Sequence, residues 1–446
     1  MKYEIIIVGA GPAGIFTALE LTRLTHASIL ILEKGTDLEA RCHPSSSRTS
    51  GWGGAGAFSD AKLTLSPDVG GFLERYLNRE EIQELIDYVD QVYLEFGAQT
   101  EIHGGDTEET HRLAREAARY DLKLVPARIR HLGTDRCIEV LKNMRKYLEG
   151  RVEVRFGENV VEVLTDSGKT VGVRTVEGKE YRSRFVVLAP GREGSDWLSR
   201  EVKRLGLSSG INPVDIGVRV ELPAPVLEPI TAVTYEAKLI FHSKKFDDKV
   251  RTFCMCPYGE VVREYFDGVW TVNGHSYAHH KTSNTNFAIL VSTTFTEPFR
   301  EPIAYGRYIA RLANLLGGEI IVQRLGDLQM GRRSTPERIQ KGVVEPTLKS
   351  ATPGDLSFVL PYRYLSDILE MLEALDHLAP GVNSMHTLLY GVEVKFYSLK
   401  LKLSRCLEAE IENLLAVGDG AGVSRGLIQA SVSGVIVARE MARRMN

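Results

Sequence analysis

Two cysteines separated by one residue, Cys254 and Cys256, lie in RTFCMCPYGEVV, the sharpest local feature in the middle of the chain. A thiolate can donate charge to an electron acceptor and a thiol can donate a proton, so either cysteine is a candidate catalytic group. In a regular strand the two side chains would point to opposite faces, and they could instead be two small buried residues. A zinc site using both cysteines with His275 or His279 lacks a recognisable ligand spacing, and we expect no metal.

The polar segment VNGHSYAHHKTSN holds a second candidate catalytic residue, His275. Its imidazole could protonate a substrate or bind a substrate carboxylate. A solvated loop explains the same composition, and both interpretations stay open.

A glycine pattern near the N-terminus predicts the element that holds a nucleotide. Gly9, Gly11 and Gly14 form G-x-G-x-x-G between an apolar run of strand length and a stretch of helical periodicity, and Glu33 ends the next apolar strand. The glycines permit a tight turn, a close approach to a pyrophosphate and close helix packing, while the acid can bind a ribose 2′-OH. The predicted cofactor-binding residues here are Gly9, Gly11, Pro12, Ala13, Gly14, Glu33 and Lys34.

The last forty residues identify the type of dinucleotide. A strand in ENLLAVGDGAGVSRGLIQAS ends at Gly418-Asp419-Gly420, and a helix follows from about Gly426. This arrangement resembles the second FAD fingerprint of the glutathione-reductase-like flavoprotein superfamily. The resemblance implies that Asp419 binds the ribityl chain and that the helix near Gly426 points its N-terminus at the flavin.

A third segment, VEVRFGENVVEVLTDSGKTVGVRTVEGKEYRSRFVVLAPGREG, predicts short strands joined by turns. It resembles the superfamily's β-meander, with Pro190 in place of the usual Thr in the closing Ala189-Pro190-Gly191 turn. The resemblance implies backbone contacts from Val160 and Val161 to the adenine and from Ala189 and Gly191 to the cofactor.

The segment RTSGWGGAGAFSDAKL has too many glycines to pack a core. In the superfamily this loop turns back along the cofactor, which implies Arg41 near the pyrophosphate and the flavin ring stacked on the backbone of Gly51, Gly53 and Gly54. A flexible surface loop is the alternative, although Trp52 favours an ordered segment. Candidates for the rim are Ser50, Ser59, Asp60 and Lys62, of which Lys62 is also a candidate catalytic residue.

Six segments together resemble one family of FAD-dependent dehydrogenases found in bacteria and archaea: SGWGGAGAFSDAKL, RIRHLGTDRC, RTFCMCPYGEVV, VNGHS, GVEVKFYS and GDGAGVSRGLIQAS. The resemblance implies an α/β fold with a Rossmann-like FAD-binding domain, discontinuous in sequence and containing a parallel sheet and a β-meander. It also implies a mixed α+β substrate domain and a helical insertion. We predict the FAD-binding domain at 1–66, 150–206 and 385–446, the insertion at 67–149 and the substrate domain at 207–384.

Composition narrows the function classes. A net charge of −3 gives no basic field for nucleic acid, and the longest apolar runs are shorter than the ~20 residues of a membrane span. Five scattered cysteines do not suggest a disulfide framework, and the chain starts without room for a signal peptide, so we expect a cytoplasmic protein.

These patterns predict an FAD-dependent oxidoreductase that exchanges a hydride or two electrons with a small organic substrate. Only one dinucleotide fingerprint is visible, so NAD(P)H could serve as a transient donor, and a ferredoxin or quinone are alternatives. Rival functions are a C=C bond reductase resembling the prenyl-lipid reductases, a flavin monooxygenase, and a non-catalytic flavin-binding redox sensor or interaction module.

Overall fold

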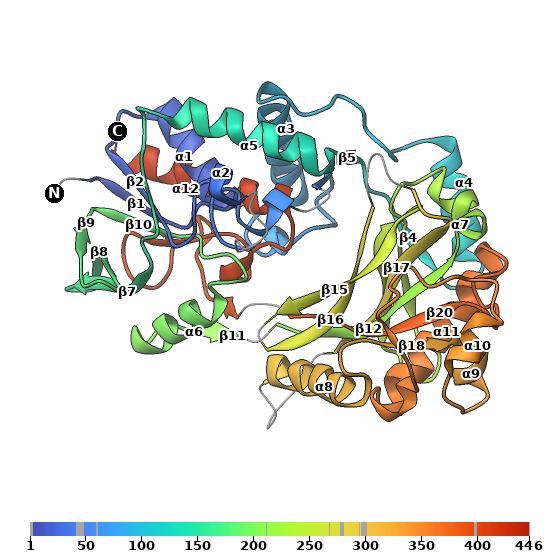
Figure 1. The fold of residues 1–446 in the computed structure, drawn as a ribbon. Coiled ribbons are helices and arrows are strands. Elements are labelled where there is room, and N and C mark those ends of the chain that lie inside the picture. The colour runs from blue at the N-terminus through green and yellow to red at the C-terminus, as the bar shows by residue number, and fades with distance from the viewer. Residues whose placement is uncertain are drawn as a thin grey trace. The chain divides into compact units, whose positions relative to one another are not determined.

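The chain folds into two compact units, each described here by itself (Figure 1). A computed structural model describes residues 3–41, 49–58, 61–210, 212–266, 268–276, 281–293, 295, 301–396 and 399–445. The first unit comprises Met1–Ile102, Arg130–Asn212 and Tyr397–Asn446, and the second comprises His103–Ile129 and Pro213–Phe396.

A parallel sheet of five strands forms the centre of the first unit, in the order β22-β10-β1-β2-β6. The strands are β1 (Ile5–Val8), β2 (Ile29–Glu33), β6 (Glu153–Phe156), β10 (Phe185–Leu188) and β22 (Leu414–Ala416). Every residue of β1, β2, β10 and β22 is buried. Continuous aliphatic runs of this kind are typical of parallel strands covered on both faces, which explains the absence of alternation in their sequences.

Two helices pack against each other in this unit, α1 (Pro12–Leu24) and α12 (Leu427–Met445). Their backbones approach closely at Gly434, where an added Cβ would overlap the carbonyl oxygen of Ala13. The other helices are α2 (Leu38–Arg41), α3 (Arg79–Glu95), α5 (Gly133–Leu148) and α6 (Ser195–Arg204). Short 3-10 turns lie at Gly54–Phe58, Leu73–Arg75 and Asp419–Ala421.

Smaller sheets complete the first unit. The predicted meander is a three-stranded sheet of β7 (Val160–Asp166), β8 (Lys169–Thr175) and β9 (Glu180–Arg182). The two-stranded sheets pair β3 (Lys62–Thr64) with β5 (Ile129–His131), and β11 (Ser209–Gly210) with β21 (Lys400–Leu401). The predicted fold class, α/β with a parallel sheet and a meander, is confirmed.

An eight-stranded sheet organises the second unit, in the order β19-β18-β20-β12-β17-β14-β13-β4. Its strands are β4 (Lys123–Val125), β12 (Val214–Pro223), β13 (Lys238–His242), β14 (Lys249–Cys256), β17 (Asn284–Thr293), β18 (Ile321–Arg324), β19 (Thr352–Pro353) and β20 (Leu388–Lys395). The neighbours are antiparallel except β18 and β19.

The helices of the second unit are α4 (Glu108–Ala118), α7 (Ala224–Thr231), α8 (Pro302–Gly317), α9 (Leu325–Gln329), α10 (Pro336–Gln340) and α11 (Tyr362–Leu378), with a 3-10 turn at Leu356–Phe358. A separate hairpin pairs β15 (Glu260–Phe266) with β16 (Val269–His275). Of the helices in the described residues, none has the length and apolar character needed to cross a membrane.

The two faces of the eight-stranded sheet differ in chemistry. Along β12 one set of alternate residues is aliphatic and joins the apolar core that includes residues of α11. The other set is Asp215, Gly217, Arg219 and Glu221, all buried. Strand β16 of the hairpin contacts β12, β14 and β20, and its Gly274 would overlap Arg219 if it carried a Cβ. Period-two alternation therefore places a buried polar row beside the hairpin.

Candidate functional site

The carboxyl ends of four adjacent parallel strands bring most of the predicted cofactor-binding residues to one edge. Gly9 follows β1, Glu33 ends β2, Ala189 follows β10, and Gly418 follows β22 shortly after. Gly9 adopts φ +110°, and a Cβ on it would overlap the carbonyl oxygen of Ala189. The loops that follow β1 and β10 therefore lie in direct contact. Ligands of open α/β sheets bind outside this edge of the strands.

The N-terminus of α1 faces this edge. Its N-cap is Gly11, which makes no side-chain capping bond, and Pro12 and Ala13 begin the helix. Among the residues that the structure describes, a Cβ on Gly11 would meet no atom within 4 Å, whereas one on Gly14 would overlap the carbonyl oxygen of Gly9. Gly14 is therefore required by the fold, and Gly11 leaves room beside N–H groups and a partial positive charge that attract a phosphate.

The Glu33 carboxylate joins three loops at the same edge. One oxygen accepts a hydrogen bond from the Ala10 amide at 2.8 Å, and the other accepts from Gly35 at 2.8 Å and Gly51 at 2.9 Å. The side chain is buried. The sequence predicted a ribose-binding acid, but the three backbone bonds show that Glu33 also fixes the shape of the site.

The glycine loop packs against the chain itself. A Cβ on Gly51 would lie 2.5 Å from Thr36 O, and one on Gly53 would lie 2.5 Å from Leu141 Cδ1. A Cβ on Gly54 would lie 3.1 Å from the Cα of Gly11. Protein atoms thus account for the exclusion of side chains here, and the contact of this backbone with a flavin ring stays a prediction.

Arg41 binds the backbone of this loop. Its guanidinium donates hydrogen bonds to Trp52 O at 2.5 Å and to Gly54 O at 3.0 Å, and the side chain is buried. Trp52 is also buried and its indole donates to Leu141 O at 3.0 Å. The ordered segment favoured by Trp52 is what the structure shows for residues 49–58, and a direct contact of Arg41 with a pyrophosphate remains untested.

Asp419 lies in the loop that follows β22. Its Oδ1 accepts a hydrogen bond from the Ser424 hydroxyl at 2.7 Å, and its Oδ2 is 3.9 Å from the Arg192 guanidinium. The neighbouring Gly420 would overlap Gly191 O if it carried a Cβ. The loops after β10 and β22 therefore touch, and they present a hydrogen-bonded carboxylate beside the turn at Gly191.

The remaining predicted cofactor residues lie in the same unit. Val160 begins β7 and is buried, Val161 is exposed, and the preceding amide of Glu158 donates to Glu33 O at 3.1 Å. Lys34 is within 3.4 Å of Glu193. Gly426 directly precedes α12, Ser50 is half-buried beside Gly35, and Lys62 begins β3. Ser59 and Asp60 lie outside the described residues.

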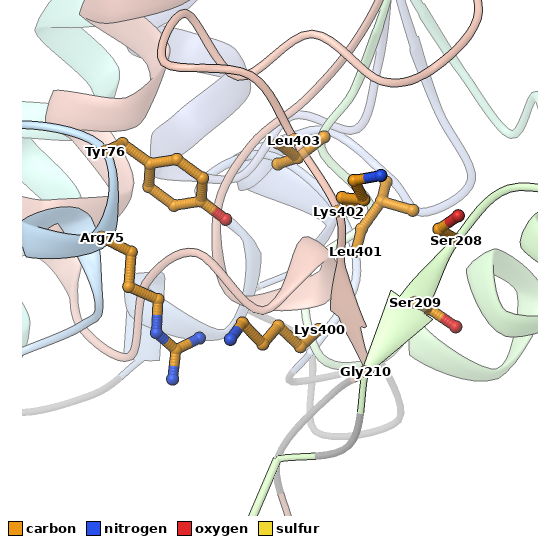
Figure 2. A pocket seen from close by; sticks show the side chains of 9 residues that line it. All are labelled: Arg75, Tyr76, Ser208, Ser209, Gly210, Lys400, Leu401, Lys402 and Leu403. Atoms are coloured by element: carbon orange, nitrogen blue, oxygen red, sulfur yellow. The ribbon is translucent and has the colours of Figure 1, made fainter.

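A basic cleft of about 440 Å³ opens in the first unit between the segment at 75–76 and the two-stranded sheet of β11 and β21. Figure 2 shows the cationic ends of Arg75 and Lys400 turned toward each other, with the ring of Tyr76 above them. Partial burial lowers the pKa of Arg75 from its ordinary value. Paired cations with a neighbouring hydroxyl can bind a carboxylate or phosphate.

The cysteine pair lies on the second unit's sheet, and the expectation of opposite faces is wrong. The pairing of β14 with β17 shifts between Phe253 and Cys256, and Cys254 has φ +45°. Residues two positions apart in a strand share a face, and at this bulge the two Sγ atoms are 3.9 Å apart. Cys256 is fully buried and Cys254 is half-buried.

Sequence analysis missed the buried arginine beside these thiols. Arg219 has no exposed side-chain surface, and its Nη2 donates to Cys254 O at 2.6 Å and to Cys256 Sγ at 3.2 Å. Its Nε donates to Asn286 Oδ1 at 2.8 Å. Burial alone would lower the pKa of Arg219, but Glu393 and the two cysteines outweigh burial and raise it. A charged residue inside the apolar stretch VDIGVRVEL was the signal that could have revealed it.

Glu393 and Lys395 complete this cluster. Glu393 is 3.5 Å from Arg219 and 2.9 Å from the Lys395 ammonium. They lie two positions apart on β20, so they share a face of that strand. His275 ends β16, paired with Glu260, and Lys62 belongs to the other unit. His279 lies outside the described residues, and within those residues no group of three or more His, Cys, Asp or Glu could hold a metal ion.

Comparison with protein families identifies the functional class of the protein. Residues 4–215 match the family described as FAD dependent oxidoreductase, and residues 213–396 match the family described as FAD-dependent protein, C-terminal domain-like. The protein is an FAD-dependent oxidoreductase. The two matches meet at the start of β12, and the predictions of an FAD cofactor and of an enzyme are confirmed.

Individual proteins similar to the oxidoreductase are distant. An uncharacterised protein of Clostridium beijerinckii is 29% identical over 100% of this chain and 82% of its own length. L-proline dehydrogenase from P. horikoshii has a TM-score of 0.44 at 12% identity, covering 99% of this chain and 94% of its own. Glycine oxidase from Geobacillus kaustophilus has a TM-score of 0.42 at 13% identity, covering 99% and 95%.

Proposed function

We propose that the oxidoreductase holds FAD along the carboxyl edge of its five-stranded sheet and exchanges a hydride or two electrons with a small organic substrate. The bound flavin would supply the electron-accepting or electron-donating ring. The chain would supply the binding loops and the protons. We also propose that the chain belongs to the glutathione-reductase-like flavoprotein superfamily, which its three fingerprint segments resemble.

The observation that carries the proposal is the space at Gly11. Three features lie at one edge of the sheet: the N-terminus of α1, which has no side-chain cap, the open space at Gly11, and the buried carboxylate of Glu33. This combination suits a pyrophosphate on the N–H groups of Ala13 and Gly14, with the ribose near Glu33.

The second half of the cofactor would follow the loops after β10 and β22. Asp419 is already oriented by Ser424, so its free oxygen is available to a ribityl hydroxyl. Gly426 precedes a helix of 19 residues, whose N-terminus favours negative charge. In this proposal the α12 N-terminus stabilises the reduced flavin.

The small-molecule substrate would be converted with the help of Cys254, Cys256, His275 and Lys62, which stay candidate catalytic residues. NAD(P)H, a ferredoxin or a quinone would exchange electrons with the flavin, since the chain shows a single dinucleotide fingerprint. No nucleic-acid partner is proposed.

An anaerobic titration of the purified, FAD-loaded protein with NADH and NADPH tests the electron partner. Bleaching of the flavin absorbance band within seconds of addition would support a nicotinamide donor. A band that persists through a large excess of both would rule out that donor, and reduced ferredoxin and quinol are then titrated in the same way. Failure of every donor, and of substrate panels, to change the band would contradict the proposed oxidoreductase chemistry at this site.

A further inference from the structure

We propose that Cys254 and Cys256 form a thiol–disulfide exchange site whose substrate is a low-molecular-weight disulfide. The site lies wholly within the second unit, and the inference does not depend on where FAD binds. It goes beyond flavin chemistry, because the electrons pass between sulfur atoms.

The backbone brings the two sulfurs together. In an unbroken strand, residues two positions apart point their side chains to the same face. A regular strand keeps those side chains parallel and separated, so their sulfur atoms would not meet. Here the shifted register after Phe253 and the left-handed backbone at Cys254 compress that spacing. The Sγ atoms are 3.9 Å apart, and closing a disulfide requires them to approach to about 2 Å, which rotation of the side chains can supply.

A buried cation favours the thiolate form of the pair. Arg219 Nη2 donates to Cys256 Sγ at 3.2 Å, and its position is fixed by Asn286 and by Gly274, which leaves no room for a side chain above the guanidinium. Thiolates are stabilised by neighbouring cations, and the thiolate is the form that attacks a disulfide.

Other charged groups surround the pair. Glu393 lies between Arg219 and Lys395, at 3.5 and 2.9 Å. Glu236 accepts a hydrogen bond from the Cys254 amide at 3.1 Å. Arg219 interacts with both cysteines, so its charge favours the thiolate form of each.

Exposure sets the order of attack. Cys254 is half-buried and Cys256 is fully buried, so the incoming disulfide RSSR meets Cys254 first. The Cys254 thiolate attacks one sulfur, forms a mixed disulfide and releases RS⁻. The Cys256 thiolate then attacks Cys254 Sγ, closes the internal disulfide and releases the second RS⁻. Two electrons pass from the protein dithiol to RSSR, and the two thiol protons end on two RSH molecules.

The direct test uses the full-length, FAD-loaded protein in buffers of graded glutathione disulfide to glutathione ratio. After each equilibration, free thiols are alkylated and the peptide that carries both cysteines is analysed by mass spectrometry. We expect this peptide to lose two hydrogens and both alkylation sites in one step as the ratio rises. Full alkylation of both cysteines at every ratio would overturn the proposal. The flavin absorbance of the same samples reports separately on the proposed cofactor site.

Three variants test the order of attack. Cys256→Ser should accumulate glutathione on Cys254, and Cys254→Ser should leave Cys256 largely unmodified. Cys406→Ser is the matched control, because Cys406 is also half-buried and 3.8 Å from an arginine, Arg444, and no other cysteine of the described residues lies beside it, so its removal should change nothing. A glutathione adduct on Cys254 that persists as long in the wild type as in Cys256→Ser would contradict the internal step.

Arg219→Lys tests the role of the cation. We expect closure of the mixed disulfide to require higher pH, with about a tenfold slower rate for each unit by which the thiol pKa rises. An unchanged pH profile in a folded Arg219→Lys protein would remove Arg219 from the site. The wild-type peptide measurement stays decisive if this variant does not fold.

Discussion

The carboxylate of Glu33 accepts a hydrogen bond from the backbone amide of Gly51 at 2.9 Å. This bond joins the end of the second strand to the glycine loop, and the same side chain accepts a hydrogen bond from the Ala10 amide in the turn after the first strand. One residue that the glycine pattern marks as a ribose ligand therefore also organises the loops around the ligand. Loss of its charge should affect both cofactor binding and the fold.

Glu33→Gln tests this double role. The amide has one acceptor oxygen in place of two, so at least one buried backbone N–H loses its partner. We expect the free energy of unfolding to fall by about 1–3 kcal/mol, and FAD to be held more weakly. Thermal unfolding of the FAD-free chain and titration of FAD measure the two effects. The control is Glu193→Gln, since Glu193 is partly exposed in its pair with Lys34, and a loss of stability as large there would contradict the interpretation.

Two glycines of one motif should respond in opposite ways. Gly11→Ala introduces a Cβ that meets no protein atom, so the FAD-free chain should keep its melting temperature while FAD affinity falls. Gly14→Ala drives a Cβ into Gly9 O and should destabilise the fold by about 1–3 kcal/mol or more. Melting temperatures without FAD and binding titrations with FAD separate the two. Equal loss of stability in both variants would contradict the assignment of Gly11 to the ligand.

The Asp419 carboxylate should contribute to FAD binding and little to folding. Within the described part of the chain, its one side-chain hydrogen bond is from the Ser424 hydroxyl, and Arg192 is 3.9 Å away. Asp419→Asn keeps an acceptor for Ser424, so we expect a normal melting temperature without FAD and an affinity for FAD lower by about tenfold or more, equivalent to about 1.4 kcal/mol. Unchanged FAD affinity would remove Asp419 from the cofactor site.

A buried carboxyl in the second unit predicts a pH dependence of stability. Burial, followed by the neighbouring Asp248, raises the pKa of Asp367 from 3.8 to about 6, against the opposing effects of Ser243 and Arg363. The folded chain therefore holds this proton more tightly than the unfolded chain does, so the contribution to stability is full below pH 3.8 and is lost as pH rises through 6.

Asp367→Asn removes this titration. Between pH 4 and pH 7 the free energy of unfolding of the wild type should fall relative to that of the variant. Denaturant unfolding at each pH measures both. Arg363 lowers the pKa of the neighbouring Asp248 below its ordinary value of 3.8. The contribution of Asp248 to stability is therefore lost in a lower range, as the pH falls below 3.8. A difference between Asp367→Asn and the wild type that does not change over this range would show that Asp367 is ionised normally.

Local patterns were sufficient to predict the strand edge at which we propose that FAD binds. Gly9, Gly14 and the strand ends are specified by short segments whose geometry follows from neighbouring residues, and the parallel sheet follows from their uninterrupted aliphatic runs. The role of Arg41 could not be predicted in this way, because it depends on carbonyl groups that reach it only after the glycine loop folds back.

The cluster of Arg219, Cys254 and Cys256 also depends on contacts between distant segments, which the sequence alone does not reveal. Arg219 and Cys256 are separated by 37 residues and meet through the pairing of β12, β17 and β14. The expectation that the cysteines point to opposite faces was wrong, because residues two positions apart in a strand share a face, and the register shift after Phe253 accompanies the close approach of their sulfurs. A bulge is a property of the paired strands and is not visible in either strand alone.

The measurement that tests the central claim most directly is the identity and stoichiometry of the cofactor released from the purified protein. After denaturation, chromatography and mass spectrometry of the supernatant should show FAD, in about one molecule per chain, and Asp419→Asn should retain less. A chain that carries no FAD and takes none up after incubation with it, while remaining folded, would contradict the account.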